Sequence, residues 1–195
     1  MKTNDKPEIK LFLLDKTDHR MYLSKIPVTE DYYWTSSPNS PYYTMPMVVW
    51  PRNEVYGENK SQKVLDKEDS DAKWACGVRP AMMIDRQLLE AQELRDGSRF
   101  WLGLNCWVVL DSETGLCISK DIICKRIMDS DDNIICWINS ELRTWMNTEL
   151  LDRLFDEGER KLIKPIGEDQ FCNGPFPDSP LASGHSAPVP KSARS

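Results

Sequence analysis

The sequence predicts an α+β fold built from short antiparallel strands and two or three short helices. Apolar runs at residues 100–110 and 116–119 flank a turn of Asp, Ser, Thr and Gly at residues 111–115, which is typical of a β-hairpin. Residues 137–163 carry Leu, Trp, Met and Phe at three- and four-residue spacing, which is typical of amphipathic helices. Strand and helix patterns therefore occupy separate stretches of the chain.

Short apolar runs elsewhere predict the remaining strands. They cover residues 10–14, 32–39, 47–50 and 76–84. Pro80 lacks an amide hydrogen, so it must lie at an edge, at a bulge or at the start of a strand. Between the first two runs, Thr17 can cap a short helix within residues 15–25. Residues 58–71 are dense in charge and poor in apolar side chains, which predicts an exposed loop.

The helical stretch is expected to consist of several pieces. Asn139 or Ser140 can cap its start, because a side-chain oxygen at that position can accept a free backbone N–H group. The pair Asn147 and Thr148, and then Gly158, are expected to break it.

Length and composition indicate one domain with an appended tail. Of 195 residues, 40% are hydrophobic, which is enough for a sizeable core. We assign residues 1–166 to a single domain, with residues 85–96 as a helical connector rich in Leu, Glu and Gln. Residues 167–195 hold five prolines among Ser, Gly and Ala, so they bury too little apolar surface to offset the entropy cost of ordering. We expect the last part of this tail to be disordered.

The charge pattern narrows the choice of partners. Acidic residues outnumber basic ones by 31 to 25, for a net charge of -6, whereas phosphate binding needs clustered Lys and Arg. Nucleic acid is therefore not an expected partner. The polar residues 1–10 lack the apolar core of a signal peptide, and no stretch approaches the ~20 apolar residues of a membrane span. The expected location is cytoplasmic, with no membrane partner.

The six cysteines predict neither a metal centre nor a disulfide framework. They form no CxxC pair, and His19 and His185 are the only histidines available to complete a zinc site. Most lie among apolar neighbours, which indicates small buried thiols, and no secretory signal indicates an oxidising compartment. We expect no metal and no cofactor.

The second half of the chain is similar to the first half of a bacterial family, the domain of unknown function 6273. That half reads W-x-V-L, then W-x-x-S-x-L-R-x-W-L-N, then F-x-x-x-E. The matching positions here are Trp107, Val109, Leu110, Trp137, Ser140, Leu142, Arg143, Trp145, Met146, Asn147, Phe155 and Glu159. The family is grouped with C-type-lectin-like folds, which are related to formylglycine-generating enzymes, so the resemblance implies that architecture.

The first half of the chain resembles the second half of the same family. The segments that start at Phe12, Trp34 and Gly77 resemble its F-L-L-S, W-L-R-S-P and G-V-R-P-A-L segments. Residues 10–84 therefore resemble the C-terminal half of the family, and residues 97–166 resemble its N-terminal half. This reversed order implies either a circular permutant or an out-of-phase piece of a tandem array. We favour the permutant, because both halves look complete and domain termini often lie close together.

The resemblance implies a binding module rather than an enzyme. The segment in which C-type-lectin-like folds present ligand loops is rich here in aromatic and small polar side chains, which suit a protein or glycan ligand. Its candidate ligand-binding residues are Trp34, Ser36, Ser37, Asn39, Tyr42 and Tyr43. The alternative to ligand binding is that Trp34 belongs to the core and that an ordinary loop follows it. Self-association is a further form of partnership, and a truncated structural fragment of a repeat protein is the alternative function.

Six other residues are interpreted as structural. They are Arg79, Trp107, Ser140, Arg143, Trp145 and Asn147. Arg79 is expected to be buried and satisfied by carbonyl groups or a carboxylate, and Arg143 to anchor a helix to a loop.

No pattern in the sequence indicates calcium binding or catalysis. The Glu-Pro-Asn and Trp-Asn-Asp motifs of sugar-binding C-type lectins are missing, and the acidic residues Asp129, Asp131 and Asp132 lack an EF-hand pattern, which favours a solvated loop. The cysteines do not match the copper-binding pair of formylglycine-generating enzymes. There is also no Gly-x-Ser-x-Gly elbow and no phosphate loop.

Overall fold

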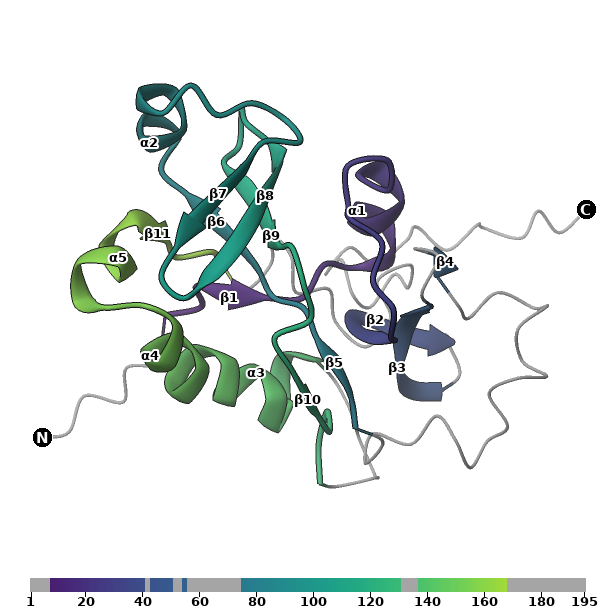
Figure 1. Cartoon of the computed structure of the whole chain (residues 1–195). Helices are drawn as coiled ribbons and strands as arrows, with labels where there is room; N and C mark the ends of the chain where they lie inside the picture. Colours follow the sequence, from purple (N-terminus) through teal and green to yellow (C-terminus); the bar gives the residue numbers. More distant parts are fainter. Residues whose placement is uncertain (1–7, 41–42, 51–53, 56–74, 131–136, 168–195) are drawn as a thin grey trace, which may run out of the picture.

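The computed structural model has an α+β architecture of two sheets and several short helices, which confirms the predicted class (Figure 1). It describes residues 8–40, 43–50, 54–55, 75–130 and 137–167. Three predictions fall outside this range: the exposed loop at residues 58–71, the disordered tail beyond Gly167, and the acidic residues Asp131 and Asp132. All three stay predictions.

The larger sheet contains six strands and draws on both halves of the chain. Its strand order is β1-β6-β9-β8-β7, and β11 pairs with β6 beside β1. The strands are β1 (Leu11–Phe12), β6 (Ala81–Ile84), β7 (Arg99–Leu102), β8 (Asn105–Asp111), β9 (Leu116–Ser119) and β11 (Ile163–Lys164). Every neighbouring pair is antiparallel. The predicted hairpin across residues 111–115 is confirmed as β8 and β9.

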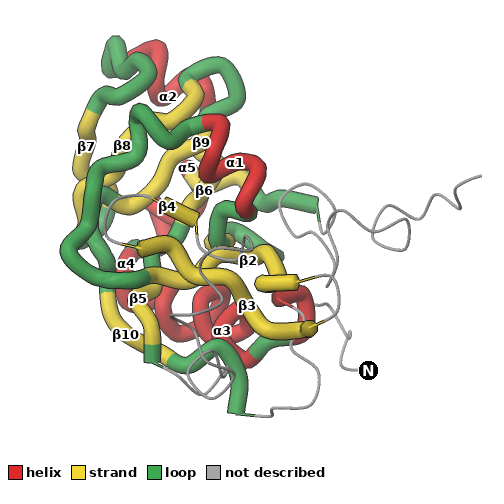
Figure 2. Tube along the Cα trace, turned by 90° about the vertical axis from the view of Figure 1, so that its right-hand side faces the viewer, coloured by secondary structure: helices red, strands yellow, loops and turns green. Residues whose placement is uncertain are grey.

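The smaller sheet has five strands in the order β10-β5-β2-β3-β4. They are β2 (Tyr33–Ser40), β3 (Tyr43–Trp50), β4 (Glu54–Val55), β5 (Cys76–Val78) and β10 (Cys124–Arg126). Its pairs are antiparallel except for β2 and β5, which run parallel and meet at Tyr33 and Gly77. Figure 2 shows β2 and β3 side by side, away from the strands β7 and β8 of the larger sheet.

One continuous segment serves both sheets. The predicted strand at residues 76–84 is two strands: β5 belongs to the smaller sheet, and β6 belongs to the larger one. The chain changes sheet at Arg79 and Pro80, so the proline lies between strands, where its missing N–H breaks no ladder. The chain crosses from the larger sheet to the smaller one again between β9 and β10. This crossing lies beside the first one, because β9 pairs with β6 and β10 pairs with β5.

The predicted strand at residues 100–110 is also wrong as a single element. A tight turn at Gly103 and Leu104 divides it into β7 and β8, which form a second hairpin. Gly103 has a φ of +61°, a left-handed conformation that glycine adopts without steric cost. The apolar run concealed this turn because Leu104 stands in it where a polar residue would be expected.

The helices are short, and the described residues contain five α-helices rather than the two or three predicted; most begin at a side-chain cap. They are α1 (Lys16–Met21), α2 (Arg86–Ala91), α3 (Glu141–Trp145), α4 (Leu151–Leu154) and α5 (Glu157–Leu162), with a 3₁₀ turn at Trp137–Asn139 and a π turn at Met146–Leu150. The helical connector predicted at residues 85–96 contains α2, which covers only its first half. Ser140 is confirmed as the cap of α3, since its hydroxyl accepts from the Arg143 N–H at 3.1 Å.

Three details of the predicted helices are wrong. Asp15, not Thr17, caps α1, and its carboxylate accepts from the Asp18 N–H at 2.7 Å. Gly158 does not interrupt the second helical stretch. The break lies one turn earlier, where Phe155 is extended and Asp156 forms a capping box with Glu159. At Asn147 the helix widens into a π turn rather than ending.

A single hydrophobic core includes residues from both halves of the chain. Leu11, Phe12, Met82, Trp107 and Val109 are each fully buried in it. The helices α3 and α4 join this core beneath the larger sheet (Figure 1), where the Trp107 ring stacks on Phe155 with 5.7 Å between ring centres. The two halves therefore pack as one unit.

Candidate binding surface

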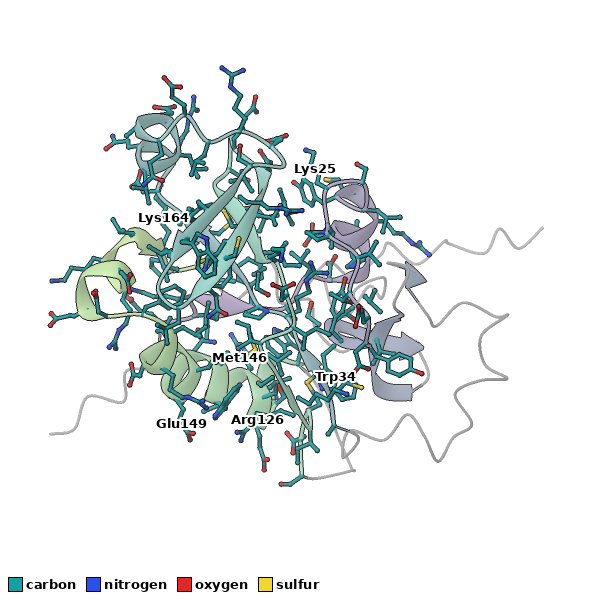
Figure 3. The ribbon with its side chains drawn as sticks, viewed as in Figure 1. Lys25, Trp34, Arg126, Met146, Glu149 and Lys164 are labelled. Atoms are coloured by element: carbon teal, nitrogen blue, oxygen red, sulfur yellow. The ribbon has the colours of Figure 1, made fainter. Side chains whose placement is uncertain are left out.

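The first residue of the predicted ligand segment, Trp34, lies inside the fold. It is 2% exposed, and its indole N–H donates to the Arg126 carbonyl at 2.8 Å. The guanidinium of Arg126 in turn lies 4.1 Å from the centre of the Trp145 ring, a cation–π contact. Figure 3 shows Trp34 near β5 and Arg126 near the α3 helix. Trp34 and Trp145 thus link the smaller sheet to the helices.

The remaining residues of that segment follow along β2 and β3. Ser36 is buried, and its backbone N–H donates to the Leu14 carbonyl at 3.1 Å. Ser37 and Asn39 lie on β2, and Tyr43 begins β3 opposite Ser40. Tyr42 lies outside the described residues. The structure places the other residues of the segment on one strand pair, and ligand binding by the whole segment stays a prediction.

A more prominent surface lies at the hairpin of β7 and β8, which sequence reasoning did not single out. Trp101 and Leu104 are each 75% exposed, the highest values among the large hydrophobic side chains that the structure describes. Along β7, Phe100 is buried while Arg99 and Trp101 are exposed, as expected for a strand whose side chains alternate between faces. This alternation was readable in the sequence, but it did not show which face would be covered.

The backbone of this hairpin is fixed to the helices beneath it. The Gly103 N–H donates to a Glu159 carboxylate oxygen at 3.0 Å, and the Leu104 N–H donates to the Leu154 carbonyl at 3.1 Å. The Trp107 indole N–H donates to the Leu102 carbonyl at 3.0 Å. The exposed Trp101 and Leu104 side chains therefore project from a rigid support.

Gly103 makes this close contact possible. A Cβ atom built on it would lie 2.0 Å from the Leu154 carbonyl oxygen, which is far inside van der Waals contact. The turn can rest on the end of α4 only because no side chain stands at this position.

A buried polar cluster joins the two sheets where the chain crosses between them. Arg79 is 1% exposed, and its Nε and Nη2 atoms donate to the carbonyls of Ser119 and Lys120 at 3.0 and 2.9 Å. Its guanidinium carbon lies 5.0 Å from the centre of the Tyr33 ring, and the Tyr33 hydroxyl is 2.5 Å from His19 Nε2. Backbone carbonyls thus satisfy much of the guanidinium, which suits a structural role.

Burial shifts the pKa values in this cluster. It lowers the pKa of His19 to about 4, with a further contribution from the charge of Arg79. It raises the pKa of Tyr33 to about 12 and lowers the pKa of Arg79. Burial also raises the pKa of the neighbouring Asp18 to about 7, and the charge of Asp15 adds to that shift. At neutral pH, His19 is therefore an uncharged side chain in the interior.

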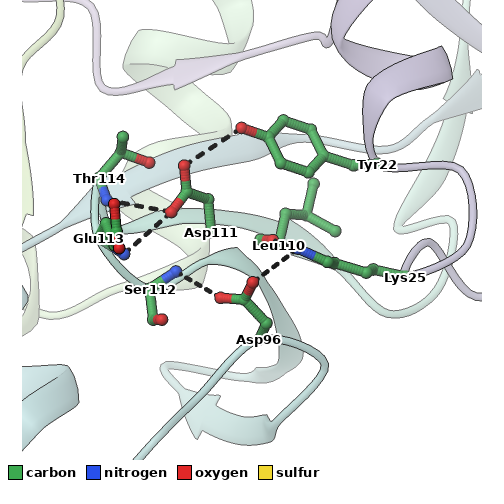
Figure 4. Close-up of polar contacts among 8 residues, drawn as sticks. All are labelled: Tyr22, Lys25, Asp96, Leu110, Asp111, Ser112, Glu113 and Thr114. Carbon is green, nitrogen blue, oxygen red and sulfur yellow. Dashed lines mark hydrogen bonds and ion pairs between the residues drawn. The ribbon is translucent and has the colours of Figure 1, made fainter.

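A second polar junction holds the end of α1 against the turn between β8 and β9 (Figure 4). Lys25 donates to Asp96 at 2.6 Å and to the Leu110 carbonyl at 2.9 Å, and the Tyr22 hydroxyl donates to Asp111 at 3.2 Å. Asp111 also accepts from the backbone N–H groups at residues 113 and 114. The ion pair and backbone hydrogen bonds lower the pKa of Asp96 to about 2. These contacts tie the first half of the chain to the second.

Asn147 makes the most complete of the contacts between the halves. Its carbonyl oxygen accepts from the N–H groups of Lys10 and Leu11 at 2.7 and 2.9 Å, and its amide donates to the carbonyls of Leu11 and Arg143. The side chain thus bonds β1 to the π turn. Arg143, also buried, lies one turn earlier on the same helix.

The described residues offer little metal-binding or thiol chemistry. Among them, no three His, Cys, Asp or Glu side chains gather closely enough to hold a metal ion. Cys76 and Cys117 are buried, which raises the pKa of both thiols, that of Cys76 to about 12. Both are therefore protonated, unreactive thiols at neutral pH.

Comparison with family models, with curated proteins and with solved structures finds no match to this chain. Within the described part, no helix combines the length and apolar character needed to cross a membrane.

Proposed function

We propose that this protein is a non-enzymatic binding module with a C-type-lectin-like scaffold in permuted order, and that it contacts a protein or glycan ligand through the hairpin of β7 and β8. One observation carries the proposal: Trp101 and Leu104 are largely exposed on a hairpin whose turn is bonded through its backbone to α4 and α5. Exposed apolar side chains on a fixed support are typical of interaction sites.

The rigidity of the hairpin favours binding because less conformational entropy is lost when a ligand settles on it. A tryptophan offers a large flat surface with few rotatable bonds, which suits both a protein pocket and the face of a sugar ring. The bonds from Gly103 and Leu104 to the helices fix the turn before any ligand arrives.

The arrangement of the two halves supports the permuted scaffold. In the order of the resembled family, residue 166 would lead directly into residue 10. The Ile166 N–H donates to the Ile9 carbonyl at 2.8 Å, so these two positions are adjacent, as that order requires. The strand β6, from the first half, and β8, from the second, also belong to one sheet within one chain.

The test is a screen of the purified chain against a glycan array and a displayed library of protein ligands, run in parallel with the variants W101A and L104S. We expect ligands that bind the wild type and are at least tenfold weaker for either variant, because hot-spot residues carry at least ~1.4 kcal/mol.

V28S is the matched control, since Val28 is 69% exposed but lies between α1 and β2. It should bind like the wild type. A screen with no ligand for the wild type, or ligands that all three variants retain, would contradict the proposal.

A further inference from the structure

The strand β7 has a free edge. It is the last strand of the larger sheet, and no other described strand pairs with it beyond β8. Figure 2 shows it along the outer margin of the fold. A strand edge of this kind carries backbone donors and acceptors that another strand can use.

The hydrogen-bond register identifies which residues supply these free groups. The Val109 N–H donates to the Ser98 carbonyl at 2.9 Å, and Phe100 lies opposite Trp107. Bonding in an antiparallel pair alternates from residue to residue, so Ser98 and Phe100 face β8. The N–H and C=O groups of Arg99 and Trp101 therefore point away from the sheet.

This edge is complementary to itself. When two copies pair antiparallel about a twofold axis at Phe100, Arg99 of one copy stands opposite the partner's Trp101, and the reverse pair forms at the same time. The outward N–H and C=O groups of both residues then bond across the axis. Arg99 and Trp101 are two residues apart and share a face, so each exposed guanidinium meets an exposed indole.

We propose that the partner of the β7 edge is a second copy of this chain, joined by antiparallel pairing of the two β7 strands with Arg99 against the partner's Trp101. This inference rests on the proposed function, because it names the protein ligand of the same hairpin. The paired strand has four residues, so the contact is small and the dimer is weak and reversible.

Sedimentation velocity over a range of concentrations tests the dimer with the full chain. We expect a shift from monomer to dimer as concentration rises. The dissociation constant of the dimer should rise at least tenfold in W101A and R99E. It should rise less in R99K, because the positive charge is kept. R86E is the matched control, since Arg86 is exposed on α2 and its loss changes the net charge equally.

Amide hydrogen exchange tests the register. At dimer concentrations, exchange at the Arg99 and Trp101 amides should slow several-fold, while the Phe100 amide, already facing β8, should not change. A dimer that R99E and W101A leave intact, or one without protection at these two amides, would overturn the proposed pairing.

The two proposals fail in distinguishable ways. A chain that remains monomeric at all concentrations but binds a glycan or another protein in a manner sensitive to W101A overturns the second copy as partner and leaves the binding module standing. Protection of the Arg99 and Trp101 amides only after an extended peptide is added has the same meaning. A monomer that also binds nothing overturns both.

Discussion

At the scale of single residues, buried polar side chains decide how the two halves fit. Asn147 meets four backbone groups with one amide, and Arg79 meets two carbonyls at the sheet crossing. Such groups stabilise a fold only when they are paired, because an unpaired buried donor or acceptor costs about 1–3 kcal/mol. Pairing is incomplete at a few atoms, because His19 Nδ1, Ser36 Oγ and Arg79 Nη1 are buried without a hydrogen-bond partner among the described residues.

The buried His19 predicts a loss of stability in acid. Its folded pKa is about 4, below its ordinary value of 6.5, so the unfolded chain takes up the proton first as pH falls. The contribution of the uncharged His19 to the free energy of unfolding is therefore fully present above pH 6.5 and is lost as pH falls to about 4. The loss amounts to about 3 kcal/mol. We expect the free energy of unfolding of the wild type, relative to H19Q, to fall by this amount over that window, measured by urea titration at each pH.

Asp18 opposes this trend and has to be separated from it. Its pKa is raised to about 7, so this residue favours the folded state more strongly as pH falls from 7 towards 3.8. The same measurement in a D18N background removes that contribution and should leave the His19 effect visible. The charged or titratable neighbours of His19 are Arg79, Tyr33 and Asp15. If the wild type and H19Q have parallel profiles of unfolding free energy against pH, the assignment of the acid sensitivity to His19 is refuted.

At the scale of elements, the hairpin of β7 and β8 depends on one glycine. In G103A, the left-handed backbone costs about 1 kcal/mol and the clash with the Leu154 carbonyl adds to it, so we expect a loss of about 2–4 kcal/mol in unfolding free energy. Ligand binding should weaken as well, because the turn must move off α4. Denaturant unfolding and the ligand screen measure the two effects.

Gly97 offers a matched comparison for this prediction. It also has a positive φ, of +80°, but a Cβ atom there would meet nothing within 4 Å. G97A should therefore cost only about 1 kcal/mol, the backbone penalty alone. Equal losses in G97A and G103A would show that the contact with Leu154 contributes nothing.

The helices and strands also show which parts of the fold could be predicted from the sequence. Local signals were sufficient where the chemistry is local: the polar turn between β8 and β9, the Ser140 cap and the connecting helix α2. They failed where long-range packing decides. The turn at Gly103 rests on α4, and Trp34 is buried where its indole N–H bonds to Arg126 on β10. No period in the local sequence encodes either contact.

For the candidate binding surface, the sequence identified aromatic side chains but not their exposure. Trp34 and Trp101 both follow an aromatic residue within a predicted strand, yet one is 2% exposed and the other 75%. The difference depends on which face of each sheet receives a covering layer. Only the assembled fold supplies that information.

At the scale of the whole molecule, the adjacent positions of Ile9 and Ile166 allow the two halves of the chain to exchange their order. We expect a rearranged chain, with residue 166 joined to residue 9 by a short Gly/Ser linker and new ends between Gln92 and Glu93, to fold with a stability within about 2 kcal/mol of the original. Circular dichroism during thermal unfolding, together with light scattering, would measure this.

Residues 97–167 alone provide the contrast. Without β1 and β6, the strand β9 and the Asn147 amide lose their partners, so this half should show no cooperative transition. A half that unfolds cooperatively by itself would instead favour the interpretation as a piece of a tandem array.

The crossing at Arg79 and Pro80 has a mechanical consequence. Because β5 and β6 are one uninterrupted stretch of backbone, tension applied to the smaller sheet passes along covalent bonds into the middle of the larger one. Separation of the two sheets also breaks the hydrogen bonds from the buried Arg79 guanidinium to the carbonyls of Ser119 and Lys120. Under load, the molecule should therefore yield in one step rather than layer by layer.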